Sequence, residues 1–119
     1  MSTILVVDDE PDLRFILRRF FARAGHEVTE ASDGAAALEA VAHRRPDLVV
    51  TDMMMPVMGG AELIRRLRAD PATVSIPILS VSADWQVAEG ADAALGKPYQ
   101  RAELVAVAER LLQEGREPR

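Results

Sequence analysis

Three aspartates follow two short apolar runs of the sequence. Asp8 and Asp9 come directly after the run 4–7, and Asp52 comes directly after the run 48–51. Short runs rich in β-branched residues and bounded by turn residues are typical of buried parallel strands. Because ligands bind at the carboxyl ends of the strands in an open α/β sheet, the three carboxylates would meet there if the two strands are neighbours. Carboxylates held together repel one another, so this cluster calls for a cation, a proton or a chemical role.

Two further side chains with useful chemistry lie at the ends of later strand-like runs. Ser82 ends the run 77–82, and Lys97 follows the weaker run 92–96. A hydroxyl can donate a hydrogen bond to a phosphoryl oxygen, and an ammonium is a compact positive charge that can pair with another. Three acids, a hydroxyl and an ammonium around one crevice therefore favour a site for a metal ion and a phosphoryl group.

Taken alone, each of these residues has a simpler interpretation. Asp8 or Asp9 could cap a helix that begins at Pro11. Ser82 could be a turn former, and Lys97 could be a solvated charge. It is their joint position at the ends of separate strands that favours the acidic metal and phosphate site.

Strand-like and helical patterns alternate along the chain and must position these residues. Strands are expected over 4–7, 27–31, 48–51, 77–82 and 92–96. Helices are expected from Pro11 to before Gly25, over about 34–44 behind Asp33, around Leu63, Ile64 and Leu67 up to Pro71, and over about 101–113. Five consecutive strand–helix units are typical of α/β proteins with a doubly wound parallel sheet. The expected fold is flavodoxin-like, with strand order 2-1-3-4-5 and the polar run 27–31 at an edge. In this order the first and third strands are neighbours, so Asp8 and Asp9 lie next to Asp52.

Composition limits the class of protein. With 119 residues, 49% hydrophobic and 28% charged, the chain has the values of one soluble globular domain. No apolar run approaches the roughly 20 residues of a membrane span, and no signal peptide precedes the first strand. The absence of cysteine fits a cytoplasmic setting, and the net charge of −5 argues against direct nucleic-acid binding. We expect one domain over residues 1–113 and a polar tail or linker stub over 114–119, in a chain that either stands alone or was cut from a longer protein.

Four short motifs at these strand ends occur together in a known family. They are Val6-Val7-Asp8-Asp9-Glu10-Pro11, Asp52-Met53-Met54-Met55-Pro56-Val57-Met58-Gly59-Gly60, Ser82-Ala83 and Gly96-Lys97-Pro98-Tyr99. In these motifs and in their order the chain resembles the receiver domains of response regulators, which have a chemotaxis-regulator-like fold and accept phosphate from two-component histidine kinases. The resemblance covers nearly the whole chain.

The resemblance implies a role for each site residue. Asp52 would be the phosphorylation site, and a carboxylate can act as a nucleophile toward phosphorus. Mg²⁺ prefers oxygen ligands, which would here come from Asp8 through water, Asp9, Asp52 and the main-chain carbonyl of Met54. Lys97 would pair with a phosphoryl oxygen, while the Ser82 hydroxyl would donate to another and so convert phosphorylation into movement of its loop. A cis Lys97–Pro98 peptide would direct the ammonium into the crevice.

The resemblance also implies partners. A histidine kinase or a phosphotransfer protein would donate the phosphoryl group, and an unknown output protein would read the result at a protein–protein surface. The domain would be a monomer or weak dimer that binds neither membrane nor nucleic acid directly. It would be a signalling phosphoacceptor rather than an enzyme, and would at most catalyse its own phosphorylation and dephosphorylation.

The chain departs from the family pattern between the fourth and fifth strands. Relatives carry a full fourth helix there, whereas this chain is about seven residues short, roughly two helical turns. The helix is therefore expected to be shortened or missing, with residues 83–89 forming one turn or an ordered loop pinned by Trp85. Ala94 stands where many relatives have an aromatic residue that swings inward on phosphorylation. Gly59 replaces a common acid, and Gln100 is a poor cap for the last helix.

Two other functions remain open. A pseudo-receiver would keep the fold as a scaffold whose output does not depend on phosphate, and the short connection and Ala94 motivate this alternative. A magnesium-dependent phosphohydrolase would also use a nucleophilic aspartate in a similar sheet. Such enzymes usually need a second acid two residues beyond the nucleophile, and Met54 occupies that position after Asp52, which disfavours the enzyme.

Overall fold

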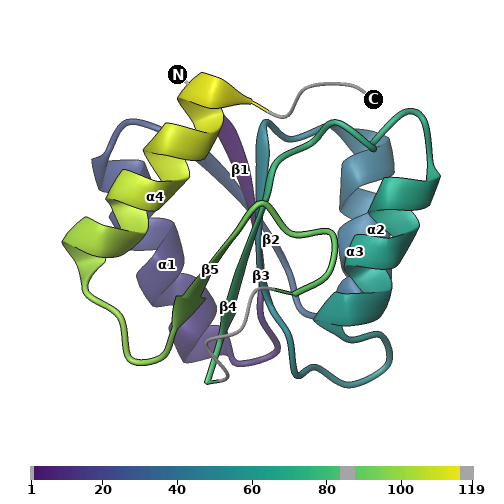
Figure 1. The fold of residues 1–119 in the computed structure, drawn as a ribbon. Helices are drawn as coiled ribbons and strands as arrows, with labels where there is room; N and C mark the ends of the chain where they lie inside the picture. Colours follow the sequence, from purple (N-terminus) through teal and green to yellow (C-terminus); the bar gives the residue numbers. More distant parts are fainter. Residues whose placement is uncertain (1, 84–87, 116–119) are drawn as a thin grey trace.

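Five parallel strands form a single sheet with helices on both faces in the computed structural model, which describes residues 2–83 and 88–115 (Figure 1). The elements are β1 (Thr3–Val7), α1 (Pro11–Arg23), β2 (Glu27–Ala31), α2 (Gly34–His43), β3 (Leu48–Asp52), α3 (Gly60–Ala69), β4 (Ile78–Ser82), β5 (Ala93–Gly96) and α4 (Arg101–Glu114). The sheet order is β2-β1-β3-β4-β5, which confirms the predicted flavodoxin-like topology. The polar strand β2 lies at an edge, as its sequence predicted.

The core has two layers, one on each face of the sheet. Helices α1 and α4 lie on one side of the sheet, and α2 and α3 lie on the other (Figure 1). The strands contribute Ile4, Val6, Val50, Leu79 and Val81 to the first layer and Leu5, Val7, Val49 and Ile78 to the second. Since successive strand side chains point to opposite faces, the central strands β1 and β3 must be apolar on both. This requirement explains their uninterrupted apolar runs.

The helix ends follow local sequence signals. The Asp33 side chain accepts a hydrogen bond from the Ala36 amide at 2.8 Å, so it caps α2 as predicted. Gly25, with a φ of 95°, follows the last turn of α1 in the left-handed conformation that glycine adopts readily. Gln100 precedes α4 without a side-chain capping bond, in agreement with the expectation that it is a poor cap.

The helical spacing of the apolar residues of α1 predicts one amphipathic face, made of Leu13, Ile16, Leu17, Phe20 and Phe21. This prediction was wrong at one position. Leu17 and Phe21 are buried, but Ile16 is 41% exposed and lies beside Phe15, which is 57% exposed. Consecutive helical residues are about 100° apart around the axis, so Ile16 lies at the border of a face that Leu17 centres. The chain thus presents two large apolar side chains on the outer surface of α1.

The connection between β4 and β5 contains no helix among its described residues, 83 and 88–92. This agrees with the expectation of a shortened or missing fourth helix, while residues 84–87, and with them the predicted pinning by Trp85, lie outside the described residues. Ser80 and Ala94 are register partners in β4 and β5. They alternate with residues packed toward α1 and α4, so this pair lies on the opposite face, which here carries small side chains.

The loop between β3 and α3 is tightly packed where it meets the helix. A Cβ atom on Gly60 would lie 2.5 Å from the carbonyl oxygen of Asp52 and 2.8 Å from Cα of Met53. At the tip of this loop Val57 has a φ of 67°, a conformation that is strained for a β-branched residue, and its side chain is 86% exposed. Position 60 therefore has no room for a side chain beside the end of β3, while the loop tip stores backbone strain.

Candidate metal and phosphoryl site

The three predicted acids meet at the carboxyl edge of the sheet. Val7 and Thr51 are register partners in the neighbouring strands β1 and β3, and the acids follow them directly in sequence. One carboxylate oxygen from each of Asp8, Asp9 and Asp52 lies within 4.8 Å of the other two. The predicted convergence is thus observed.

Asp8 is the buried member of the cluster. Its residue is 2% exposed, and its Oδ1 accepts a hydrogen bond from the Glu10 amide at 2.9 Å. Burial raises the pKa of Asp8, and the charges of Asp52 and Asp9 raise it further, against the opposing effects of the Glu10 amide and Lys97. A buried carboxylate that is costly to ionise and lies among other acids is the environment in which a cation is most useful.

The alternative that these acids merely cap α1 is not supported by the geometry. Glu10 occupies the N-cap position and makes no side-chain capping bond. Asp8 binds the amide of Glu10, which precedes the helix, and its own carbonyl accepts a hydrogen bond from Nη1 of Arg14 at 2.7 Å. The Asp8 carboxylate therefore shapes the turn that leads into the helix and also contributes an oxygen to the cluster.

Asp52 lies between the acids and the only lysine of the sequence. Its Oδ1 is 3.4 Å from Nζ of Lys97 and also accepts a hydrogen bond from the Met53 amide at 2.9 Å. The side chains of Asp52 and Lys97 are 11% and 30% exposed, so the pair is sheltered but open to solvent on the lysine side. The Thr51 hydroxyl donates to the Asp52 carbonyl oxygen at 2.7 Å, which further fixes the end of β3.

Ser82 and Lys97 are joined where β4 and β5 end. Ser82 is the register partner of Gly96, and the amide of Lys97 donates to the Ser82 carbonyl oxygen at 2.8 Å. The Lys97–Pro98 peptide is cis, as predicted. The structure thus brings the hydroxyl residue and the ammonium residue to the same sheet edge as the acids.

Met54 and Tyr99 each lie two residues beyond a charged residue of this edge, Asp52 and Lys97. The Met54 side chain is 83% exposed and points its apolar atoms to solvent, so only its main chain is relevant to the predicted metal ligation. Burial raises the pKa of the Tyr99 hydroxyl, and the charges of Asp8 and Asp52 act in the same direction. In the sequence, the one sign that Tyr99 lies near Asp8 and Asp52 is its position two residues after Lys97.

The donor set fits a hard divalent cation. Carboxylate oxygens are the ligands that Mg²⁺ prefers, and few protein ligands are needed because Mg²⁺ keeps several waters. Asp8, Asp9 and Asp52 provide such oxygens close together, while the Lys97 ammonium lies on one side to pair with an anion. The arrangement can therefore bind a cation and a phosphoryl group side by side.

Comparison with known proteins identifies the family. The family model of the response regulator receiver domain matches residues 4–109. The chain belongs to this family. Receiver domains take a phosphoryl group from histidine kinases in two-component systems and are signalling phosphoacceptors, not enzymes in the usual sense.

Two curated relatives are transcriptional regulators. The phosphate regulon transcriptional regulatory protein PhoB of Pseudomonas aeruginosa is 38% identical over 112 residues, which are 88% of this chain and 49% of that protein. The transcriptional regulatory protein PrrA of Mycobacterium tuberculosis is 43% identical over 114 residues, which are 92% of this chain and 49% of that protein. The receiver thus spans about half the length of the curated relatives it matches.

A solved receiver has the same fold. The receiver domain of the sensor histidine kinase PA1611 from Pseudomonas aeruginosa PAO1 gives a TM-score of 0.87 at 27% identity, over 94% of this chain and 98% of that one. That structure holds a magnesium ion coordinated in its active site cleft. In the described part of the present chain, no helix is both long enough and apolar enough to cross a membrane.

Proposed function

We propose that this receiver accepts a phosphoryl group on Asp52, with Mg²⁺ held by Asp8, Asp9, Asp52 and the main-chain carbonyl of Met54. The observation that carries the proposal is the position of the Asp52 carboxylate, which lies within 4.8 Å of oxygens from both other acids and 3.4 Å from Nζ of Lys97. A carboxylate in this position has a cation site on one side and an ammonium on the other. Phosphoryl transfer depends mainly on such alignment and charge neutralisation.

The proposed transfer is a simple substitution at phosphorus. A carboxylate oxygen of Asp52 forms the new P–O bond while the P–N bond of a phosphohistidine breaks, and the electron pair of that bond stays on the imidazole nitrogen. Lys97 pairs with one phosphoryl oxygen and the Ser82 hydroxyl donates to another. Bound Mg²⁺ would offset the negative charge that collects on the phosphoryl oxygens.

The donor in this proposal is a histidine kinase or a phosphotransfer protein, and the output passes to a protein partner. The phosphoacceptor unit comprises residues 1–113, with 114–119 as a tail or linker, and it works in the cytoplasm as a monomer or weak dimer. Its own catalysis is limited to its phosphorylation and dephosphorylation. The two transcriptional regulators it resembles support an output partner that controls gene expression.

Intact mass after incubation with phosphoramidate and Mg²⁺ tests the proposal. Wild type should gain one phosphoryl group, and the Asp52→Asn variant should gain none because the amide is not a nucleophile toward phosphorus. Asp70→Asn, which changes an exposed acid after α3, is the matched control and should be phosphorylated like wild type. An unchanged wild-type mass would reject the proposal.

A pseudo-receiver is the second candidate function. It is favoured by Ala94, whose methyl group cannot act as an aromatic switch, and by the absence of a helix among described residues 83 and 88–92. Amide chemical shifts of β5 and α4, recorded with and without phosphoramidate, separate the two functions. Shifts that change on phosphorylation support the receiver, whereas a phosphorylated protein with unchanged shifts supports the scaffold.

A further inference from the structure

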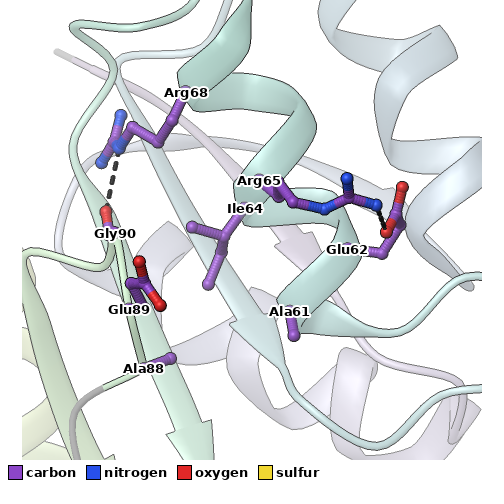
Figure 2. A pocket seen from close by; sticks show the side chains of 8 residues that line it. All are labelled: Ala61, Glu62, Ile64, Arg65, Arg68, Ala88, Glu89 and Gly90. Atoms are coloured by element: carbon purple, nitrogen blue, oxygen red, sulfur yellow. Dashed lines mark hydrogen bonds and ion pairs between the residues drawn. The ribbon is translucent and has the colours of Figure 1, made fainter.

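Among the described residues, Arg68 in the last turn of α3 donates to four acceptors from two separate connections. Its Nε donates to the Gly90 carbonyl oxygen at 2.9 Å (Figure 2), and its Nη2 donates to Oδ2 of Asp92 at 2.8 Å. Its Nη1 donates to the carbonyl oxygens of Val74 and Ile76 at 2.8 and 2.7 Å. The side chains of Arg68 and Asp92 are only 13% and 18% exposed, so this is a sheltered ion pair.

Asp92 in turn starts the pairing of β4 with β5. Its amide donates to the Ile78 carbonyl oxygen at 2.8 Å, and its Oδ2 accepts from the Ile78 amide at 2.8 Å. From this reciprocal pair the ladder runs through Leu79 and Ala93 to Ser82 and Gly96. Because register is set once for the whole pair of strands, the first pair determines which residues meet at the other end.

The end of the β4–β5 connection rests directly on α3. Gly90 has a φ of 89°, and a Cβ atom there would lie 2.8 Å from Cγ2 of Ile64. Figure 2 shows Ala88, Glu89 and Gly90 facing Ile64 and Arg68 across a shallow groove. No helix is present in described residues 83 and 88–92, and Arg68 and Asp92 make contacts that hold the residues just before β5.

We propose that Arg68 is a positioning residue for the phosphoryl site, which it serves from the far end of the sheet through Asp92. Together they set the β4–β5 register that places Lys97 beside Ser82 and Asp52, so the inference rests on the proposed function of that site. Arginine suits this role because its planar fork presents five donors in fixed directions, whereas lysine has one point charge on a flexible stem. Removing the guanidinium would also leave the half-buried Asp92 carboxylate without its ion-pair partner in Arg68.

Paired measurements on Arg68→Gln test the inference. The rate of phosphorylation by phosphoramidate should fall about tenfold or more, since small misplacements of reacting groups have large effects on rate. Mg²⁺ affinity, measured by calorimetry, should stay within about twofold of wild type, because its proposed ligands lie at the ends of β1 and β3 and share no hydrogen-bond partner with Arg68 among the described residues. Arg66→Gln is the matched control, since Arg66 belongs to the same helix and pairs with Glu62 at an exposed position. It should change neither quantity.

Amide hydrogen exchange reports the register without any phosphate chemistry. The Lys97 amide, which donates to the Ser82 carbonyl oxygen at 2.8 Å, should exchange at least about tenfold faster in Arg68→Gln, while β1 and β3 amides keep their protection. Asp92→Asn is a milder variant that keeps an oxygen for the Ile78 amide. Like Arg68→Gln, it should raise the exchange rate of the Lys97 amide and lower the phosphorylation rate, each by a smaller factor. It replaces Arg68→Gln in the test if that variant does not fold.

Three results would overturn the inference. They are a wild-type phosphorylation rate in the folded Arg68 or Asp92 variant, equal losses of rate and of Mg²⁺ affinity, which would mean general loosening, and unchanged exchange of the Lys97 amide. If wild type itself is not phosphorylated, the proposed function fails, and the exchange of the Lys97 amide still decides whether Arg68 sets the register.

Discussion

Nζ of Lys97 lies 3.4 Å from Oδ1 of Asp52, so the carboxylate that we propose as the phosphoacceptor is paired with a cation. The ammonium therefore has two opposite effects on the site. It competes electrostatically with a metal ion for the acids, and it provides a charge that a phosphoryl oxygen can use. Substitution of Lys97 should separate these effects.

Lys97→Met should slow phosphorylation by phosphoramidate about 10²-fold, because a charge aimed at the transferred group is lost from the transition state. The same variant should bind Mg²⁺ several-fold more tightly, since a positive charge near three acids has been removed. Calorimetry and intact-mass kinetics measure the two quantities. Parallel weakening of both would contradict the assigned position of the ammonium.

Because Lys97 is the only lysine in the sequence, reductive methylation adds one side-chain label, with the α-amino group as the other reactive amine. We expect the methyl resonances of Lys97 to shift when Mg²⁺ and beryllofluoride are added together. The Asp52→Asn protein provides the control and should show a much smaller shift. Identical spectra in the two proteins would show that the ammonium does not respond to the acceptor site.

Asp8→Asn should stabilise the metal-free protein at neutral pH by about 1 kcal/mol, because it removes a buried charge that two other acids repel. Burial raises the pKa of Asp8 above its ordinary value of 3.8, so the folded state binds this proton more tightly than the unfolded state. The corresponding stability is present below the ordinary pKa and is lost as the pH rises through the raised pKa. The advantage of Asp8→Asn should therefore grow over that interval.

Urea unfolding in the presence of a chelator, repeated across this pH range, measures the effect. Asp9→Asn is the control at an exposed position and should gain less. Excess Mg²⁺ should reverse the order by stabilising wild type through binding. A metal-free Asp8→Asn protein that is less stable than wild type at neutral pH would refute the account.

Val57→Asn should raise the free energy of unfolding by about 0.5–1 kcal/mol, because asparagine tolerates the left-handed region far better than a β-branched residue does. The φ of 67° at Val57 is the source of the strain, and its 86% exposure means that little packing is lost. Val57→Thr keeps the branching and should leave stability unchanged. Equal stabilities of all three proteins in urea would show that the loop tip is not strained.

Gly60→Ala should destabilise the protein by about 1–3 kcal/mol, because the added Cβ meets main-chain atoms that cannot move aside easily. The nearest of them, the Asp52 carbonyl oxygen, lies 2.5 Å from the Cβ position. The shift should also displace Asp52, the proposed phosphoacceptor, and lower the phosphorylation rate. At the neighbouring Gly59 the nearest atom is 3.1 Å away, so Gly59→Ala should be milder in both assays.

Much of the site was predictable from the sequence, because its residues lie at the ends of strands whose order follows from the fold. Once the alternation of strands and helices indicates a doubly wound parallel sheet, the acids after β1 and β3 must meet, and Asp8 and Asp52 do so. Local signals also specified Asp33 as a cap and the left-handed Gly25, because capping and φ are determined within a few residues. The burial of Ile16 was predicted wrongly, because periodicity cannot tell where a helix face ends against a sheet of unknown width.

Long-range polar pairs were not predictable in the same way. Arg68 and Asp92 are 24 residues apart, and nothing in the sequence distinguishes Arg68 from Arg65 or Arg66 on the same helix. Their role arises only when the end of α3, the start of β4 and the start of β5 are placed together in space. The raised pKa of Tyr99 has a similar origin, since burial and the charges of Asp8 and Asp52 are properties of the folded chain.

The reciprocal hydrogen bonds between Asp92 and Ile78 make the alignment of β5 with β4 independent of the length of the connection before them. Where strand pairing is weakly specified, a longer connection allows the incoming strand to slide along its neighbour, and the alignment of the two strands is then lost. Here the anchor lies after the connection, at the first pair of the ladder, so residues can be gained or lost before Gly90 without moving Lys97. The domain can therefore accommodate a helix, an inserted recognition loop or an engineered peptide at this point and still align its phosphoryl site, which makes the connection a natural place for lineages and designers to diversify it.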